Sequence, residues 1–171
     1  MPRYSASVSF SCWALSRDPV RYGSFRTSAI LGHGGFATNL GRIGSGASLL
    51  SNEEFQLVQR IRAAGGGLVY APDAQVSHLA EAKRLTRSWF RKRAAWQAVS
   101  DFTMEPDRFL AEAPGQWEGT VGYFNALPPH LRTIRGLVHD TDDPELFRWQ
   151  TGAIYMLTIM MLAGFQGVAR D

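Results

Sequence analysis

The chain has 171 residues, which is long enough for one domain with a sizeable hydrophobic core. A hydrophobic fraction of 45% and a charged fraction of 19% exclude an intrinsically disordered chain. The single cysteine, Cys12, excludes a disulfide framework and a cysteine-rich zinc site. With a net charge of +3 and no known nucleic-acid-binding motif, no nucleic acid is expected as a partner.

The first third of the chain predicts little regular structure. Residues 1–23 show no stable hydrophobic period, and their opening stretch is a poor signal peptide because serines interrupt its apolar core. Residues 32–51 are rich in glycine, which predicts a loop. The sequence therefore predicts a cytoplasmic protein, and a place at the inner face of the plasma membrane stays open.

A helix is predicted over residues 52–64. Apolar residues recur there at helical spacing, and Gly65-Gly66-Gly67 is expected to end the helix. Ser51 and Glu54 have the spacing of a capping box. Glu53 and Glu54 could instead hold a general base at the helix N-terminus, and spacing alone favours the capping role for Glu54.

Two short strands are predicted next, over residues 68–71 and 74–78. His78 would then stand at a strand end, where active sites of α/β proteins gather. An imidazole at that place could ligate a metal or contact a diphosphate, although a lone histidine is more often structural.

The following segment, residues 84–100, predicts an amphipathic helix with a strongly basic first half. Arg84, Arg87 and Arg91 share one stripe, and no acidic residue occurs between Ala82 and Ser100. Arginine forks pair with phosphate oxygens, so this helix could bind a nucleotide diphosphate or a lipid phosphate. The alternative is a helix face that is merely solvated.

From residue 101 onward the pattern is helical with proline breaks. Pro106 is expected to open a short helix that Pro114-Gly115 ends, and Pro128-Pro129 to open another. Thr141 is expected to cap a last helix, which makes Asp140-Thr141-Asp142 a capping segment rather than a metal–diphosphate motif. The apolar stretch 153–165 is too short to span a membrane, and it could pack on the core, form a homodimer contact or lie on a membrane surface.

The order of these segments resembles the second half of a family 2 glycosyltransferase of the GT-A fold. The resemblance covers residues 24–100. It is carried by Gly34-Gly35-Phe36, Leu40-Gly41-Arg42, Leu49 to Glu54, Val69 to His78 and Arg84 to Arg93.

The resemblance implies an inverting transfer of a sugar from a nucleotide-sugar donor to a hydroxyl acceptor, in polysaccharide or glycoconjugate synthesis. It places the catalytic base at Glu54 with Glu53 beside it. His78 would lie near a diphosphate bridged by Mg²⁺ or Mn²⁺ and is the tentative metal ligand. The remaining residues implied to face the diphosphate or a lipid-linked acceptor are Arg84, Arg87, Trp89 and Arg91.

The expected fold class is accordingly α/β, a truncated GT-A-like fold. Residues 1–23 would be an irregular segment, residues 24–100 the C-terminal half of the glycosyltransferase domain, and residues 101–171 a helical extension. The donor-binding half has no counterpart in this sequence, so the chain alone is expected to be inactive. The alternative function is a non-catalytic remnant or interaction protein that binds anionic lipid or another polyanion through its arginine-rich helix.

Overall fold

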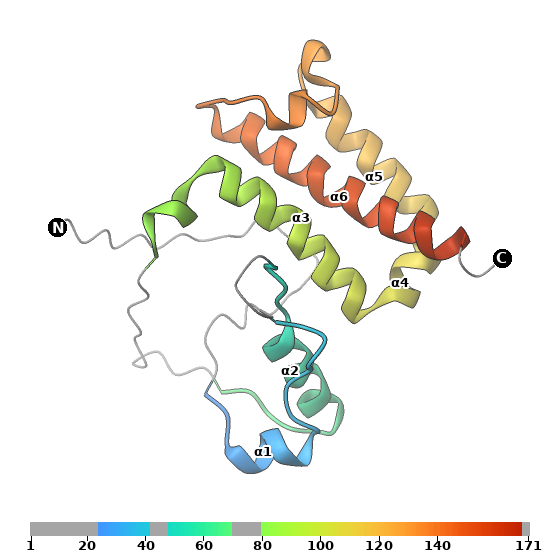
Figure 1. Ribbon diagram of the computed structural model, residues 1–171. Coiled ribbons are helices and arrows are strands. Elements are labelled where there is room, and N and C mark those ends of the chain that lie inside the picture. Colours follow the sequence, from blue (N-terminus) through green and yellow to red (C-terminus); the bar gives the residue numbers. More distant parts are fainter. Residues whose placement is uncertain (1–23, 42–47, 70–79, 169–171) are drawn as a thin grey trace.

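The computed structural model describes residues 24–41, 48–69 and 80–168. These residues form six α-helices and three short 3₁₀ turns (Figure 1). In chain order they are α1 (Thr27–Gly32), α2 (Glu53–Ala63), η1 (Ala82–Leu85), α3 (Arg87–Met104), α4 (Pro106–Ala111), α5 (Ala113–Ala126), η2 (Pro129–Leu131), η3 (Gly136–Val138) and α6 (Pro144–Val168).

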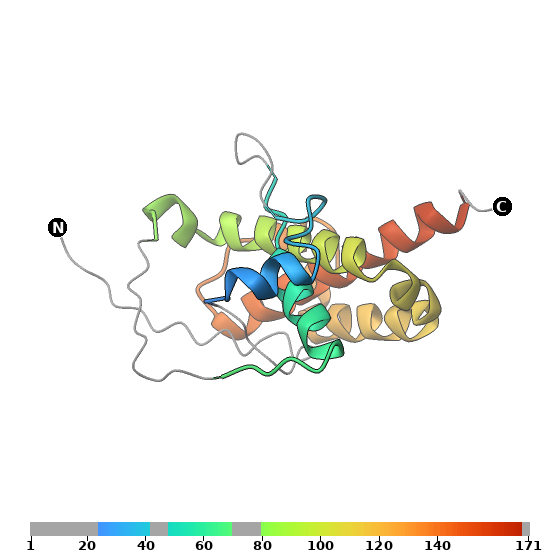
Figure 2. The same ribbon diagram turned by 90° about the horizontal axis from the view of Figure 1, so that it is seen from below.

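Helix α6 is the centre of a helical bundle. It packs against α3 on one side and α5 on another, and α4 closes the bundle near the C-terminal end of α6 (Figures 1 and 2). One core cluster joins α3, α4 and α6, and a second lies between α5, η3 and α6. Their buried members are Ala98, Phe102, Phe109, Tyr155, Ile159 and Ala163 in the first cluster and Leu127, Leu137 and Ala153 in the second.

Two glycines let α5 and α6 approach each other closely. A Cβ at Gly152 of α6 would lie 2.1 Å from the ring of Tyr123, and a Cβ at Gly119 of α5 would lie 2.9 Å from the methyl carbon of Met156. At Gly119 the flexible end of Met156 could move aside, whereas at Gly152 the rigid Tyr123 ring leaves no room for a Cβ. The close α5–α6 contact therefore depends chiefly on Gly152.

Helices α1 and α2 form a smaller region on the opposite side of α3 from α6 (Figure 1). Helix α2 buries Leu57, Val58 and Ile61, as the helical spacing predicted. Its end is also as predicted: Gly65 has a φ of 84°, and the amide of Gly66 donates to the Ile61 carbonyl at 2.9 Å. This is a Schellman ending, in which glycine adopts the left-handed conformation that L-residues avoid.

The expected α/β fold class is wrong, because the described part of the chain is helical and contains no strand or sheet. Of the predicted strand 68–71, Leu68 and Val69 are described; they lie in no strand and are 49% and 93% exposed. A strand is stabilised by a neighbouring strand and by a buried face, and within the described part of the chain these two residues have neither. The predicted strand 74–78 lies outside the described residues.

The proline positions explain where the predicted C-terminal elements differ. Pro106 opens α4 as expected, but Pro114 lies in the first turn of α5 instead of ending α4. Pro128-Pro129 begins only the 3₁₀ turn η2, and the chain reaches α6 through a second turn, η3. Proline lacks an amide proton, so it fits a first helical turn equally well at either helix. Within the described residues, no helix has the length and apolar character needed to cross a membrane.

Candidate functional site

The segment that leads into α2 is fastened to α3 by side-chain hydrogen bonds. The Ser51 amide donates to the Ser100 hydroxyl at 3.0 Å, and Asn52 Nδ2 donates to Asp101 Oδ1 at 2.6 Å. Gln97 Nε2 donates to Asn52 Oδ1 at 3.0 Å, so both ends of the Asn52 amide are held. Asn52 has a left-handed φ of 81°, which asparagine tolerates better than most residues.

Arg93 completes this attachment from the same face of α3. Its guanidinium donates to the Leu49 carbonyl at 3.1 Å, to the Ser51 hydroxyl at 3.0 Å and to Gln97 Oε1 at 2.7 Å. On the other side of α3, the Tyr155 hydroxyl of α6 donates to Asp101 Oδ2 at 2.7 Å. The start of α2 is thereby connected through α3 to the centre of the bundle.

The predicted capping box at Ser51 and Glu54 is wrong. Helix α2 begins at Glu53, Asn52 occupies the N-cap position, and no side chain caps the helix. The physical reason is competition, because the Ser51 hydroxyl accepts from Arg93 and Asn52 takes a conformation that turns it toward α3. Glu54 therefore has no capping role.

The two carboxylates at the start of α2 have different surroundings. Glu53 packs against Gly41, where an added Cβ would lie 3.0 Å from the Glu53 carboxyl carbon, and its Oε2 atom is buried without a hydrogen-bond partner. Glu54 is exposed, and within the described residues it makes no hydrogen bond or ion pair. Both lie in the first helical turn, whose free amide groups favour a negative charge.

The glycine loop is held by the last turn of α2. Arg60 donates from Nη1 to the His33 carbonyl at 2.6 Å and from Nη2 to the Gly35 carbonyl. Gly34 and Gly35 both have positive φ, and a Cβ at Gly34 would lie 3.1 Å from Arg60 Nη1. Two of the motifs that carry the resemblance therefore contact α2, one near each end of the helix.

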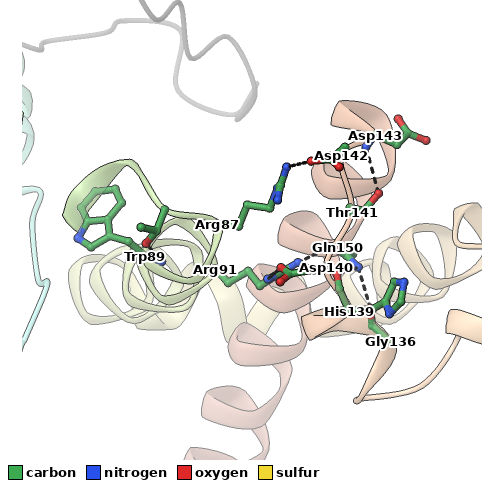
Figure 3. Close-up of polar contacts among 11 residues, drawn as sticks. Arg87, Trp89, Arg91, Gly136, His139, Asp140, Thr141, Asp142, Asp143 and Gln150 are labelled. Carbon is green, nitrogen blue, oxygen red and sulfur yellow. Dashed lines mark hydrogen bonds and ion pairs between the residues drawn. The ribbon is translucent and has the colours of Figure 1, made fainter. Parts of the chain in front are cut away.

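The basic helix predicted over 84–100 is present as α3, and most of its arginine stripe is paired within the chain (Figure 3). Arg87 forms an ion pair with Asp142. Arg91 is largely buried and reaches Asp140 Oδ1 at 3.3 Å, the His139 carbonyl at 2.7 Å and Gln150 Oε1 at 3.1 Å. These contacts attach α3 to the segment that leads into α6.

Arg84 and Trp89 lie together at the start of α3. The Arg84 guanidinium carbon stands 5.3 Å from the centre of the Trp89 ring, a cation–π arrangement. The Thr86 hydroxyl caps the helix by accepting from the Trp89 amide at 3.2 Å. The Trp89 ring points away from the paired Arg87 and Arg91, which extend toward the aspartates on the other side of α3 (Figure 3).

The capping role predicted for Asp140-Thr141-Asp142 is wrong in its details. Asp140 and Asp142 pair with arginines of α3. The residue that caps the N-terminus of α6 is Asp143, which directly follows this segment. Asp143 Oδ1 accepts from the Glu145 amide at 2.8 Å, and the Thr141 hydroxyl accepts from the Asp143 amide at 3.1 Å. Thr141 thus supports the turn before α6, whereas Asp140 and Asp142 connect this segment to α3.

The sequence-predicted residues therefore fall into two groups. Glu53 and Glu54 lie at α2, whereas Arg87, Trp89 and Arg91 lie in the first half of α3 and Arg84 lies in the preceding turn η1. No hydrogen bond or ion pair among the described residues connects the two groups. His78 and the rest of the Val-x-His element lie outside the described residues.

A metal site for Mg²⁺ or Mn²⁺ was implied by the resemblance alone. The described residues bring no three histidine, cysteine, aspartate or glutamate side chains together as a ligand set, and the tentative ligand His78 is not among them. Glu53 and Glu54 offer carboxylate oxygens, which these hard cations prefer, but two adjacent residues do not define a coordination shell. The mechanism proposed below assigns no step to a metal ion.

The polar side chains of α3 that position the start of α2 were not identified from the sequence. Arg93, Gln97 and Asp101 recur every four residues along one face of α3 and meet Ser51, Asn52 and Tyr155 there. The signal was available, since polar residues at helical spacing inside an otherwise amphipathic helix indicate a polar contact face. Their partners lie more than 40 residues away and could not be named from the pattern.

Comparisons with known proteins assign no family to this chain. No family model, curated protein or solved structure matches it. The glycosyltransferase resemblance is therefore carried by the residues quoted for it in the sequence, and the function is argued from those residues and their geometry.

Proposed function

We propose that this chain is the acceptor-side part of an inverting glycosyltransferase and that Glu54 is its general base. The observation that carries the proposal is the arrangement around α2. The glycine loop and Gly41 contact this helix, and the segment 48–52 that leads into it is fastened to α3. Within the described residues the Glu54 carboxylate is exposed and makes no hydrogen bond or ion pair. Two motifs of the resemblance thus contact the helix that presents this potential base.

The chemistry follows from the properties of a carboxylate at that position. An acceptor hydroxyl within hydrogen-bond distance of Glu54 would transfer its proton to the carboxylate as its oxygen attacks the anomeric carbon of the donor. The new carbon–oxygen bond forms as the bond to the nucleoside diphosphate breaks, and the electron pair leaves on the diphosphate oxygen. Attack from the face opposite the leaving group inverts the anomeric configuration.

The surroundings of Glu53 support its assignment as a neighbour rather than as the base. One of its oxygens is buried against Gly41, so an acceptor could not approach that oxygen without displacing the loop. The alternative function, polyanion binding by the arginine-rich helix, has less support. Arg87 and Arg91 are paired with Asp142 and Asp140, so much of the charge of that helix is already balanced.

The proposal is tested by measuring the release of nucleoside diphosphate from UDP-, GDP- and dTDP-sugars by the polypeptide that its native locus expresses. A panel of sugar and lipid-linked hydroxyl acceptors is supplied. Glu54→Gln is expected to lower the rate of transfer about 100-fold or more, because general-base catalysis contributes that much. The unchanged circular dichroism spectrum would show that the variant is folded.

The matched control is Glu118→Gln, which removes another exposed glutamate, on α5, and is expected to transfer at the wild-type rate. Transfer by Glu54→Gln at the wild-type rate would remove Glu54 from the role of base. No release from any of the donors, with or without acceptor, would contradict the proposed activity itself.

A further inference from the structure

A groove of about 580 Å³ lies between the first half of α3, the segment before α6, and α6 itself. Ser88 and Lys92 of α3 line it on one side. Its apolar lining comes from Ile134, Leu137, Val138 and Ile154. Ile134 is 69% exposed and Val138 is 61% exposed, so the apolar lining continues onto the outer surface.

The chain segments that form this groove carry both basic and acidic residues, and the acids are grouped at Asp140, Asp142 and Asp143. Between Glu118 and Asp140 the sequence has no acidic residue, and it contains Arg132 and Arg135. The α3 side is equally free of acids, since none occurs between Ala82 and Ser100. Asp140 also lines the groove, but it is paired with Arg91.

Three cations on the chain segments that form the groove have no acidic partner within the described part of the chain. Lys92 and Arg135 form no ion pair there. Arg132 donates to the Leu127 and Asn125 carbonyls, each at 2.9 Å, which orients its guanidinium without neutralising it. In the arginine stripe of α3, by contrast, Arg87 and Arg91 each have an aspartate partner (Figure 3). Lys92 lines the groove together with Ile134 and Val138, and Arg132 and Arg135 stand within two residues of Ile134 in the sequence.

We propose that this face, defined by Lys92, Arg132, Ile134, Arg135 and Val138, binds the surface of a membrane that contains anionic lipid. Ile134 and Val138 enter the boundary between head groups and acyl chains, where burial of apolar area is favourable. The three cations lie against lipid phosphates, and each basic residue near such a surface contributes about fivefold to partitioning at low salt. The segment between α5 and α6 that carries four of these residues lies at the edge of the bundle (Figure 1).

The composition of this face distinguishes a bilayer from other anionic partners. A free phosphate would engage the cations and leave Ile134 and Val138 in water. Single-stranded nucleic acid is usually bound by aromatic side chains on which bases stack, and none of the residues lining this groove is aromatic. A bilayer supplies both the negative charge and the apolar layer.

The test is co-sedimentation of the purified chain with phosphatidylcholine vesicles that either contain or lack phosphatidylglycerol. Binding is expected only when phosphatidylglycerol is present, and it should weaken as salt is raised. Lys92→Glu and Arg135→Glu are each expected to lower partitioning at least fivefold. Val138→Asp is expected to lower it further because it removes the apolar insertion as well.

Matched variants outside this face serve as controls. Lys83→Glu makes the same charge change at a lysine that already pairs with Glu81, and Leu31→Asp changes a residue of α1 that is 74% exposed. Both are expected to bind as the wild type does. The proposal is overturned if both kinds of vesicle bind equally or neither binds. It is also overturned if the controls lose as much binding as the variants of the face, or if inorganic phosphate displaces the chain from vesicles at equal ionic strength.

Discussion

The two regions of this molecule are held together by different forces. The bundle of α3 to α6 is stabilised by apolar packing, with Ile159 and Ala153 fully buried at its centre. The smaller region around α2 buries only a few apolar side chains and is fixed by arginines that donate to backbone carbonyls. Apolar packing tolerates neighbours of similar volume, whereas an arginine between two carbonyls requires one geometry. The region that carries Glu54 is therefore held more by polar contacts of defined geometry and is the less deeply buried of the two.

The largest of these effects is expected where α5 and α6 leave no room for a Cβ. Gly152→Ala should lower the free energy of unfolding by about 1–3 kcal/mol, because its Cβ would overlap the Tyr123 ring and force α5 and α6 apart. Gly164→Ala, on the same helix with nothing within 4 Å, should instead raise it by about 0.5–1 kcal/mol through helix propensity. Urea unfolding of both variants measures the difference, and equal effects would show that the α5–α6 contact does not depend on Gly152.

A smaller and more local effect is expected in the region around α2. Arg60→Gln removes the donors to the His33 and Gly35 carbonyls and should cost about 1–2 kcal/mol. Hydrogen exchange should become faster in residues 33–36 while the amides of α6 keep their protection. Arg60→Lys should restore little of the loss, since an ammonium group lacks the planar fork that reaches both carbonyls. Uniformly faster exchange in both regions would contradict the separation between them.

The smallest effect concerns the contact that joins the two regions. Burial, and next the neighbouring Asp101 carboxylate, raise the pKa of the Tyr155 phenol above its ordinary value. The native state thus retains this proton at pH values where the unfolded chain, with a tyrosine pKa of about 10, has lost it. The contribution of Tyr155 to stability is complete below that pH and declines as the pH rises further. Urea unfolding between about pH 9 and pH 11 should show a shallower decline for Tyr155→Phe than for the wild type, and identical declines would contradict this assignment.

The elements that could be predicted from the sequence are those specified by neighbouring residues. Helix α2 was predicted with its glycine ending, because both the apolar spacing and Gly65 act within a few residues. The capping box failed because Arg93, a distant residue, takes the Ser51 hydroxyl. The sheet failed because a strand depends on partners elsewhere in the chain, and Leu68 and Val69 have none.

The candidate site shows the same division. Glu53 and Glu54 were identified from their place before a helix, and the structure then distinguishes them by exposure. Of the predicted arginine stripe, Arg87 and Arg91 lie on α3 and Arg84 lies in the preceding turn, and the aspartate partners of the first two come from a segment about 50 residues away. A charge pattern along one helix indicates which side chains share a face. It does not identify the residues, distant in the sequence, that contact this face in the folded chain.

The left-handed backbone at Asn52 has a mechanical consequence. Helix α2 is about 16 Å long, so a rotation of about 10° at its first residue would move its far end by about 3 Å. Arg60 sits near that far end and carries the Gly34–Gly35 turn with it. The contacts of Asn52 with Gln97 and Asp101 hold its φ angle. The direction of α2, and with it the position of the glycine turn that Arg60 holds, therefore depends on the backbone conformation of this one residue.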